Sequence, residues 1–194
     1  VVVHIETSEA GAPAFYTHGA KLILAEGEGA KLNAAGIAGV IDAIDKGVHY
    51  IHPQAVAITQ ASEYGLSYTA DEVAAIGLFA RQHGLRLHMD GARFANAVAF
   101  RGCAPAAMSC AAGVDTLAFG MVKNGGMGAE ALVLFDPALA EQTRIRRKRA
   151  GHLQSKGRYL AAQLLALVEG DLWLENARAA NAAAQEIAAA AGCR

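Results

Sequence analysis

One stretch of the sequence places a strand, a helix and a second strand in direct succession, and this order constrains the fold most. Ala55 to Gln60 is an apolar run of strand length. Thr69 and Glu72 have the spacing of a capping box, which predicts a helix that ends at Gly84. Leu85 to Asp90 follows at once as the next strand. Strands that alternate with helices predict an α/β fold, with a mostly parallel sheet flanked by helices.

The same alternation extends to both sides of this unit. Further short strands are expected at residues 1–6, 21–25, 116–119 and 131–135, and helices at residues 33–45, 95–100 and 105–112. Three helical stretches, 137–150, 152–168 and 171–191, then follow without strands, and Asp171 is the expected N-cap of the last. We therefore expect residues 1–136 to form part of a large α/β domain. Residues 137–194 are expected to form connecting helices that lead to a truncated small domain.

Composition and charge exclude several classes of protein. The formal net charge of −1 gives no general attraction to nucleic acid, and no apolar run has the length of a membrane span. The three cysteines lack the CxxC spacing of a zinc or redox site, so no metal centre is expected and a reducing, cytoplasmic setting fits best. The sequence begins without methionine and ends within a helical pattern, so we expect a fragment that lacks both ends of a longer protein.

Two residues with complementary chemistry follow predicted strands. Asp90 closes the strand at 85–90, and Lys123 lies in the glycine-rich turn 120–126. Ligands of such sheets bind beyond the carboxyl ends of the strands, so both side chains are expected at one edge. Pyridoxal 5'-phosphate (PLP) requires a lysine amine for a Schiff base and a carboxylate that keeps the pyridine nitrogen protonated. The apolar residues before Lys123 predict that its amine is partly desolvated.

Each candidate residue also has a structural interpretation. Taken alone, Asp90 is more often a turn or N-cap aspartate, and Lys123 more often a solvated loop residue. Arg93 is either a surface residue at a helix start or a donor to an anionic oxygen of cofactor or substrate. His4 lies in an expected strand, and His49 lies just before one. By themselves such histidines are more often structural than catalytic.

Five segments of the sequence resemble the low-specificity threonine aldolases, which belong to the β-eliminating lyase group of fold-type-I PLP enzymes. They are HIETSEAGAP, HYIHPQAVAITQAS, HMDGAR, FGMVKNGGMGAEALVLF and RRKRAGHLQSKGRYLAAQLLAL. Each segment alone is a weak signal, whereas five in this order are specific and extend over essentially the whole chain. The resemblance implies the large-domain fold of the PLP-dependent transferases.

The resemblance also implies roles for the candidate residues. It makes Lys123 the Schiff-base lysine, Asp90 the partner of the pyridine nitrogen, Arg93 a cofactor contact, His4 the residue stacked on the pyridine ring, and His49 a neighbour of the substrate β-hydroxyl. The implied enzyme is a PLP-dependent aldehyde-lyase that cleaves threonine-like β-hydroxy-α-amino acids to glycine and an aldehyde. Its implied partners are a small-molecule amino-acid substrate and other copies of the chain in a homodimer or homotetramer, with no nucleic acid and no membrane.

Two other interpretations stay open. One keeps PLP and changes the reaction to that of another fold-type-I lyase or a racemase, which substrate profiling would separate from aldol cleavage. The other is a non-catalytic truncated fragment that serves only in folding or oligomerisation. An absorption spectrum recorded with PLP distinguishes this last interpretation from both enzymes.

Overall fold

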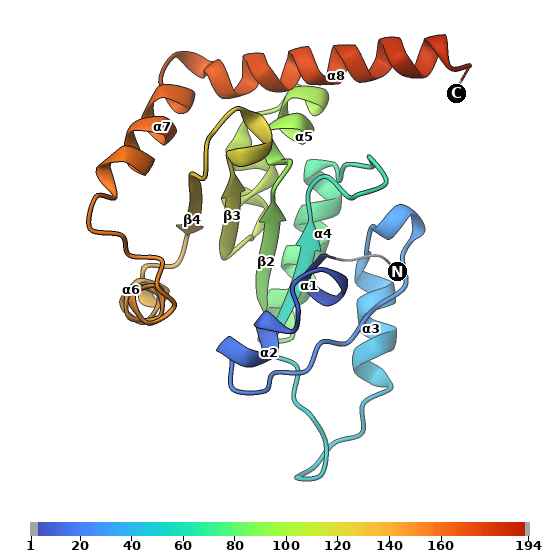
Figure 1. Ribbon diagram of the computed structural model, residues 1–194. Coiled ribbons are helices and arrows are strands. Elements are labelled where there is room, and N and C mark those ends of the chain that lie inside the picture. Colours follow the sequence, from blue (N-terminus) through green and yellow to red (C-terminus); the bar gives the residue numbers. More distant parts are fainter. Residues whose placement is uncertain (1–3, 193–194) are drawn as a thin grey trace.

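A four-stranded sheet forms the centre of the protein, whose computed structural model describes residues 4–192 (Figure 1). Its strands are β1 (Ala55–Thr59), β2 (Arg86–Gly91), β3 (Thr116–Gly120) and β4 (Glu130–Leu134), and they lie side by side in this order. The first three strands run parallel, and β4 runs antiparallel to β3. The predicted α/β fold with a mostly parallel sheet is therefore confirmed.

Helices connect the strands and flank the sheet. The longer ones are α3 (Ala34–Asp42), α4 (Ala70–Gln82), α5 (Phe94–Arg101), α6 (Ala140–Arg149), α7 (Arg158–Val168) and α8 (Leu172–Ala190). Two short helices, α1 (His4–Thr7) and α2 (Ala12–Tyr16), begin the described chain. Short 3₁₀ helices lie at Glu28–Ala30, Pro105–Met108, Cys110–Ala112, Val122–Asn124, Pro137–Leu139 and Glu169–Asp171. No helix within residues 4–192 combines the length and the apolar character needed to cross a membrane.

Capping residues fix the helices that precede β1 and β2. The Thr69 hydroxyl accepts a hydrogen bond from the Glu72 amide at 3.1 Å, and the Glu72 carboxylate accepts one from the Thr69 amide at 2.7 Å. The predicted capping box of α4 is therefore present, and the helix ends where Gly84 adopts a φ of 68°. Asn33 caps α3 in the same manner by accepting from the Gly36 amide at 2.8 Å.

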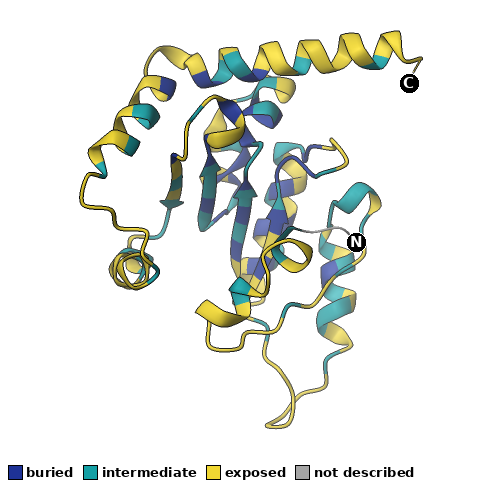
Figure 2. Cartoon of the chain, in the orientation of Figure 1, coloured by how far each residue is buried: buried dark blue, intermediate teal, exposed yellow. Residues whose placement is uncertain are grey.

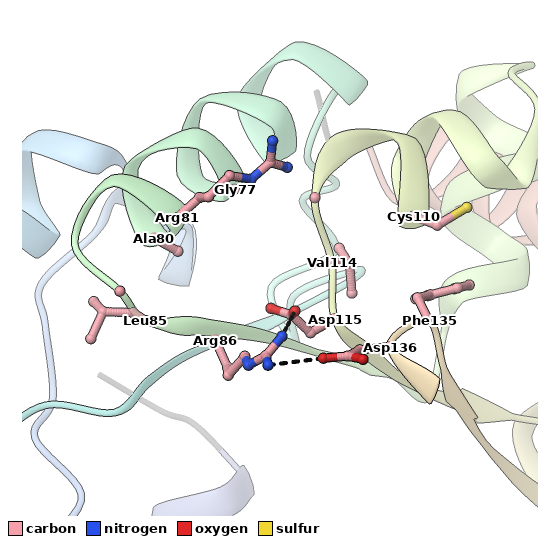
Figure 3. Close-up of a pocket in the computed structure, with 12 residues that line it drawn as sticks. Gly77, Ala80, Arg81, Leu85, Arg86, Cys110, Val114, Asp115, Phe135 and Asp136 are labelled. Atoms are coloured by element: carbon pink, nitrogen blue, oxygen red, sulfur yellow. Dashed lines mark hydrogen bonds and ion pairs between the residues drawn. The ribbon is translucent and has the colours of Figure 1, made fainter. Parts of the chain in front are cut away.

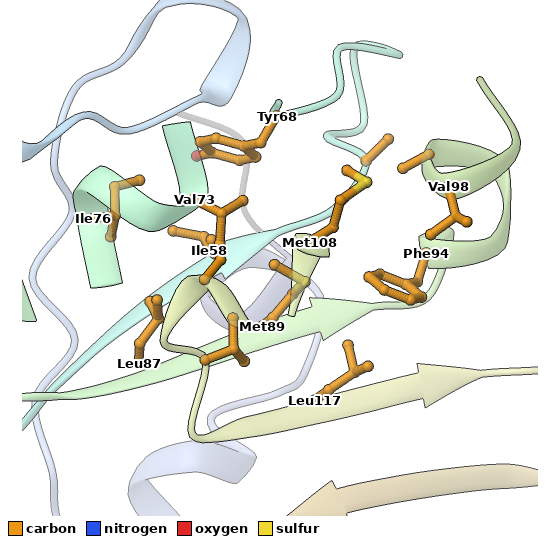
Figure 4. Close-up of a cluster of buried hydrophobic side chains, with 14 of the residues drawn as sticks. Ile58, Tyr68, Val73, Ile76, Leu87, Met89, Phe94, Val98, Met108 and Leu117 are labelled. Carbon is orange, nitrogen blue, oxygen red and sulfur yellow. The ribbon is translucent and has the colours of Figure 1, made fainter. Parts of the chain in front are cut away.

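The hydrophobic core lies between the sheet and helices α4 and α5 (Figure 4). Leu87, Met89 and Gly91 are the buried members of β2 and alternate with less buried residues, as expected of a strand with one face on the core. Further core members are Ile58, Val73, Ile76, Phe94, Val98, Met108 and Leu117. Tyr68 is also fully buried; its hydroxyl accepts from the Leu32 amide at 2.6 Å, and burial raises its pKa to about 12.

Helix α8 lies across the end of the sheet at which β2 finishes, and it packs along α5 (Figure 1). Asn96 of α5 donates to the side-chain oxygen of Asn181 at 3.0 Å, and Asn181 donates back to the Asn96 carbonyl at 3.0 Å. The Trp173 ring meets the Phe119 ring edge-on at a centroid distance of 5.4 Å. Most other residues of α6 and α8 face solvent, whereas the buried residues gather on the sheet, α4 and α5 (Figure 2).

Three local predictions are wrong. The chain from His4 to Thr7 forms a helix rather than part of a buried strand, and residues 1–3 of that predicted strand lie outside the described residues. Residues 21–25 are irregular, and none of them is buried. Within the described chain, neither residues 4–6 nor residues 21–25 have a pairing strand, so both segments lack the ladder hydrogen bonds of a sheet. Asp171 occupies the N-cap position of α8 but makes no capping hydrogen bond, because its backbone is left-handed rather than extended.

Candidate active site

A cavity of about 260 Å³ lies beyond the carboxyl ends of β2 and β3. Residues from β2, β3, the turn after β3 and the start of β4 surround it: Asp90, Ala92, Ala118, Gly120, Val122, Lys123 and Glu130. The parallel pairing of β2 with β3 brings the ends of both strands to the same edge of the sheet. The structure therefore brings Asp90 and Lys123 together, although they are well separated in sequence.

Two glycines allow the segments on either side of the cavity to approach closely. A Cβ atom at Gly120 would lie 2.6 Å from the Ala92 Cα, and one at Gly91 would lie 2.6 Å from the Ala118 carbonyl oxygen. Any larger residue would have to displace backbone at these points. The end of β3 and the turn after β2 are thus held together by backbone contact.

Asp90 presents a carboxylate at this edge with one oxygen engaged and the other available. Oδ1 accepts a hydrogen bond from the Ala92 amide at 2.9 Å, which is the geometry of a turn aspartate. Within residues 4–192, Oδ2 has no hydrogen-bond or ion-pair partner. The structural and the functional interpretations of Asp90 are therefore compatible, because each needs a different oxygen.

Lys123 lies in the 3₁₀ helix Val122–Asn124 and is exposed, so the expected partial desolvation is absent in this structure. The turn that carries it is fixed by Glu130, the first residue of β4. The Glu130 carboxylate accepts from the Met121 amide at 3.2 Å and from the Val122 amide at 3.1 Å. Hydrogen bonds to an ionised acceptor are stronger than neutral ones, so Glu130 holds the backbone directly before the lysine.

The other side of the lysine turn is fixed by α8. Asn124 is buried, and its amide group donates to the Trp173 carbonyl at 2.8 Å. Asn176 donates in return to the Asn124 carbonyl at 3.0 Å. The backbone on both sides of Lys123 is therefore restrained, while the side chain itself stays exposed.

Arg93 stands at the N-cap position of α5, three residues beyond Asp90, and is half-buried. It does not line the cavity. Its guanidinium makes no hydrogen bond or ion pair with the described part of the chain. A contact of Arg93 with a cofactor or a substrate stays a prediction.

The two candidate histidines lie in different places. His4, in α1, has Nε2 at 2.8 Å from a carboxylate oxygen of Glu63, in the loop after β1. That loop begins at Gln60, whose backbone N–H donates to the Asp90 carbonyl at 2.8 Å. Through Glu63 and this loop, His4 is linked to the carboxyl edge of the sheet. His49 lies exposed in the loop that precedes the amino end of β1, and the structure does not bring it to the cavity.

His88 lies two residues before Asp90 on the same face of β2. One ring nitrogen, Nδ1, is 2.7 Å from the Thr116 hydroxyl of β3. Burial lowers the pKa of His88 below its usual value, although the Asp90 carboxylate acts in the opposite direction. The residue is therefore a neutral hydrogen-bonding partner between two strands at neutral pH.

Sequence reasoning missed three residues that hold the site: Glu130, Asn176 and Glu63. Glu130 precedes an apolar strand, and Asn176 lies in an alanine-rich helix, so neither has a local pattern that distinguishes it from a solvated residue. Their contacts join segments that are distant in sequence and become visible only in the folded chain. Glu63 follows the predicted strand 55–60, and its place beyond a strand end was the one available signal.

A larger cavity of about 510 Å³ lies at the opposite edge of the sheet, between α4 and the strand ends (Figure 3). Its central charged group is Arg86, which pairs with Asp115 at 2.7 Å and with Asp136 at 2.8 Å. This cavity contains no lysine, and its acidic groups are already paired with Arg86, so the smaller cavity is the better candidate for PLP chemistry. Within residues 4–192 no group of three or more His, Cys, Asp or Glu side chains is placed to hold a metal ion.

Comparisons with known proteins identify a family. Residues 3–193 match the sequence profile of the family described as beta-eliminating lyase. A low specificity L-threonine aldolase from a Pseudomonas species is 48% identical over 183 residues, which cover 94% of this chain and 52% of that protein. A second one, from Pseudomonas aeruginosa, is 47% identical over 186 residues, with coverages of 95% and 53%. The chain thus spans about half the length of the curated relatives it matches.

A solved structure agrees with this match. A threonine aldolase from Leishmania major superposes on the chain with a TM-score of 0.86 at 31% sequence identity. The superposition covers 98% of this chain and 56% of that one. The described fold is therefore that of a threonine aldolase over the matched half.

Proposed function

Because this chain belongs to the beta-eliminating lyase family, we propose that it forms the cofactor-binding part of a PLP-dependent aldehyde-lyase. The proposed reaction is aldol cleavage of threonine-like β-hydroxy-α-amino acids to glycine and an aldehyde. The observation that carries the proposal is the single cavity lined by both Lys123 and Asp90. The choice of reaction is supported by relatives that are named threonine aldolases.

The residues of the cavity fit PLP. Bound PLP supplies an electron sink for the bond that breaks at the substrate Cα. Lys123 has no ion pair with the described part of the chain, so its amine is available for covalent attachment. Asp90 retains an unengaged oxygen that can accept a hydrogen bond from the ring nitrogen and keep it protonated. Gly120 adds no side chain to the cavity wall, which leaves room for a planar group.

The remaining residue roles in the proposal rest on the resemblance. His4 packs against a face of the cofactor ring, and Arg93 contacts the cofactor beside Asp90. His49 is proposed to lie near the substrate β-hydroxyl, where it or a water that it orients accepts the hydroxyl proton. In the described chain His49 lies in the loop before the amino end of β1 and does not line the cavity, so this role rests on the resemblance alone.

We extend the proposal to the setting of the enzyme. The substrate is a small amino acid, the compartment is the cytoplasm, and the assembly is a homodimer or homotetramer. Large apolar side chains such as Phe15 and Val48 are 77% and 93% exposed, which supports association with another copy. Residues 1–136 are proposed to belong to the large domain, and residues 137–194 to the helical segment that leads to the small one.

Lys123→Ala, made in the protein expressed from its complete coding sequence, tests the proposal. We expect this variant to lose both the near-visible absorption band of bound PLP and the release of aldehyde from threonine. Lys156→Ala is the matched control, because Lys156 is exposed in a segment away from the cavity, and it keeps both signals. Retention of the band in the K123A protein would refute the assignment of the lysine.

The unaltered protein distinguishes the other interpretations in the same assay. A PLP band without production of glycine and aldehyde would favour another fold-type-I lyase or a racemase. Absence of any PLP band would favour a non-catalytic fragment.

A further inference from the structure

Glu63 contains the one buried side-chain polar atom of the described chain that has no hydrogen bond. The atom is Oε1, which has essentially no contact with solvent. Burial of an unsatisfied carboxylate oxygen costs free energy, so such an atom in a folded protein requires an explanation. Most of the Glu63 side chain is buried with it, since only 22% of the side chain is exposed.

The loop that carries Glu63 is closed by hydrogen bonds and is attached to the strand that carries Asp90. The buried Gln60 side chain donates to the Tyr68 carbonyl at 3.1 Å and accepts from the Tyr68 amide at 3.0 Å, which closes the loop at its base. Ser62 and Leu66 are joined by a backbone hydrogen bond of 2.8 Å inside it. The backbone N–H of Gln60 also donates to the Asp90 carbonyl, and these contacts together position Glu63 beyond the end of β1.

The group that lies against this oxygen is the imidazole of His4. Its Nε2 is 2.8 Å from Oε1, close enough for an ion pair, but the alignment does not meet hydrogen-bond geometry. The other ring nitrogen, Nδ1, forms a hydrogen bond of 3.4 Å with the Glu9 carboxylate, which is exposed. No residue of helix α1 is fully buried, and His4 and Ile5 are half-buried. The Glu63 contact is therefore a principal attachment of His4 to the carboxyl edge of the sheet.

We propose that Glu63 is a positioning residue of the aldol-cleavage site, whose buried carboxylate orients the His4 imidazole beside the cofactor. The inference rests on the proposed function for the role of His4. A carboxylate only accepts hydrogen bonds, so the contact selects the form of His4 that carries a proton on Nε2. The His4 side chain remains 43% exposed, which leaves ring surface for a planar ligand. A small rotation of the imidazole against such a ligand aligns Nε2–H with Oε1 and satisfies the buried oxygen.

Glu63→Gln and Glu9→Gln in the complete protein form a matched pair, because each removes one carboxylate charge beside His4. The imidazole ¹⁵N shifts of His4 are measured in the PLP-free and in the PLP-loaded protein. The dissociation constant of PLP is measured by fluorescence quenching when PLP is added to the PLP-free protein. We expect E63Q to change the His4 shifts, to weaken PLP binding and to lower kcat/KM for threonine by about 10-fold or more. We expect E9Q to leave PLP affinity and kcat/KM near those of the unaltered protein.

A double-mutant cycle with His4→Phe decides whether Glu63 acts through His4. If it does, H4F/E63Q is no worse than H4F alone. Additive losses, or His4 shifts and PLP affinity in E63Q that match those of E9Q, would overturn the inference. Glu63→Asp keeps the charge on a shorter side chain and is expected to recover part of the E63Q loss, which separates positioning from misfolding. The ¹⁵N shifts and the PLP affinity decide the inference even if the reaction proves to be another PLP reaction.

Discussion

At the scale of single residues, the site depends on how the two oxygens of Asp90 are used. Oδ1 is fixed by the Ala92 amide, and Oδ2 has no partner within residues 4–192. A fixed, ionised acceptor suits a protonated ring nitrogen, because a charge-assisted hydrogen bond is about twice as strong as a neutral one. The turn interaction therefore prepares the carboxylate for the cofactor instead of competing with it.

Replacement of Asp90 by asparagine isolates this charge. The amide oxygen can still accept from Ala92, but the negative charge that keeps the ring nitrogen protonated is lost. We expect Asp90→Asn to lower kcat for aldehyde release at least about 100-fold, the scale measured for loss of one preorganised electrostatic partner. The PLP content should stay near that of the unaltered protein, and Asp45→Asn in an exposed loop serves as the control. A kcat near that of the unaltered protein would show that Asp90 does not face the ring nitrogen.

At the scale of secondary-structure elements, α8 connects the two segments that carry the site. Through Asn176 it holds the turn of Lys123, and through Asn181 it holds α5, which begins just after Asp90 and Arg93. Both asparagines donate to a backbone carbonyl from the same helix, and Asn181 also accepts a hydrogen bond from the Asn96 side chain. They differ in which segment they restrain.

These contacts give a pair of variants that can be compared. Asn176→Ala should destabilise the fold by about 1 kcal/mol, the usual net value of one hydrogen bond, and Asn181→Ala by about 2 kcal/mol, because Asn181 makes two such bonds. Only Asn176→Ala should also weaken PLP binding, because it frees the Asn124 carbonyl beside Lys123. Denaturant unfolding and PLP titration measure the two effects separately. Equal PLP affinities of the two variants would show that α8 supports the fold without restraining the lysine turn.

Strand β2 also carries a pH-dependent contribution to stability through His88. Its pKa is lowered by burial from the usual value of 6.5, so the unfolded chain takes up a proton more readily than the folded protein. This part of the stability is complete above pH 6.5 and is lost as the pH falls from there through the folded pKa.

His88→Gln should therefore reduce the loss of stability on acidification. Glutamine keeps a polar group near the Thr116 hydroxyl and has no proton to take up in this range. Free energies of unfolding, measured for both proteins above and below pH 6.5, give the two pH slopes. Identical slopes would mean that His88 does not contribute to the acid lability.

Elements with local signals could be predicted from the sequence, and elements without them could not. The capping box at Thr69, the N-cap at Asn33 and the glycine at 84 set α3 and α4 by short-range contacts, and all three are present in the structure. The apolar runs at 1–6 and 21–25 were indistinguishable from strands because strand formation depends on a distant partner. Asp171 has the residue type of a cap, but its backbone conformation is set by the turn before α8.

At the scale of the whole molecule, the two edges of the sheet have different chemistry. The carboxyl edge holds the Lys123 amine, which has no ion pair within residues 4–192, and the Asp90 carboxylate, of which one oxygen is engaged. The opposite edge holds an arginine that is paired with two aspartates. The sequence predicted the first pair because residues after parallel strands meet at one edge. It could not predict the support from Glu130 and Asn176 or the contact between Glu63 and His4, because these depend on how distant segments pack.

The structure of the complete protein with PLP tests the central claim most directly. We predict cofactor density joined to the Lys123 Nζ, with the ring nitrogen about 2.7–2.9 Å from an Asp90 carboxylate oxygen, the distance of a charge-assisted hydrogen bond. Cofactor attached to a different lysine, or a ring nitrogen with no contact to Asp90, would contradict the account.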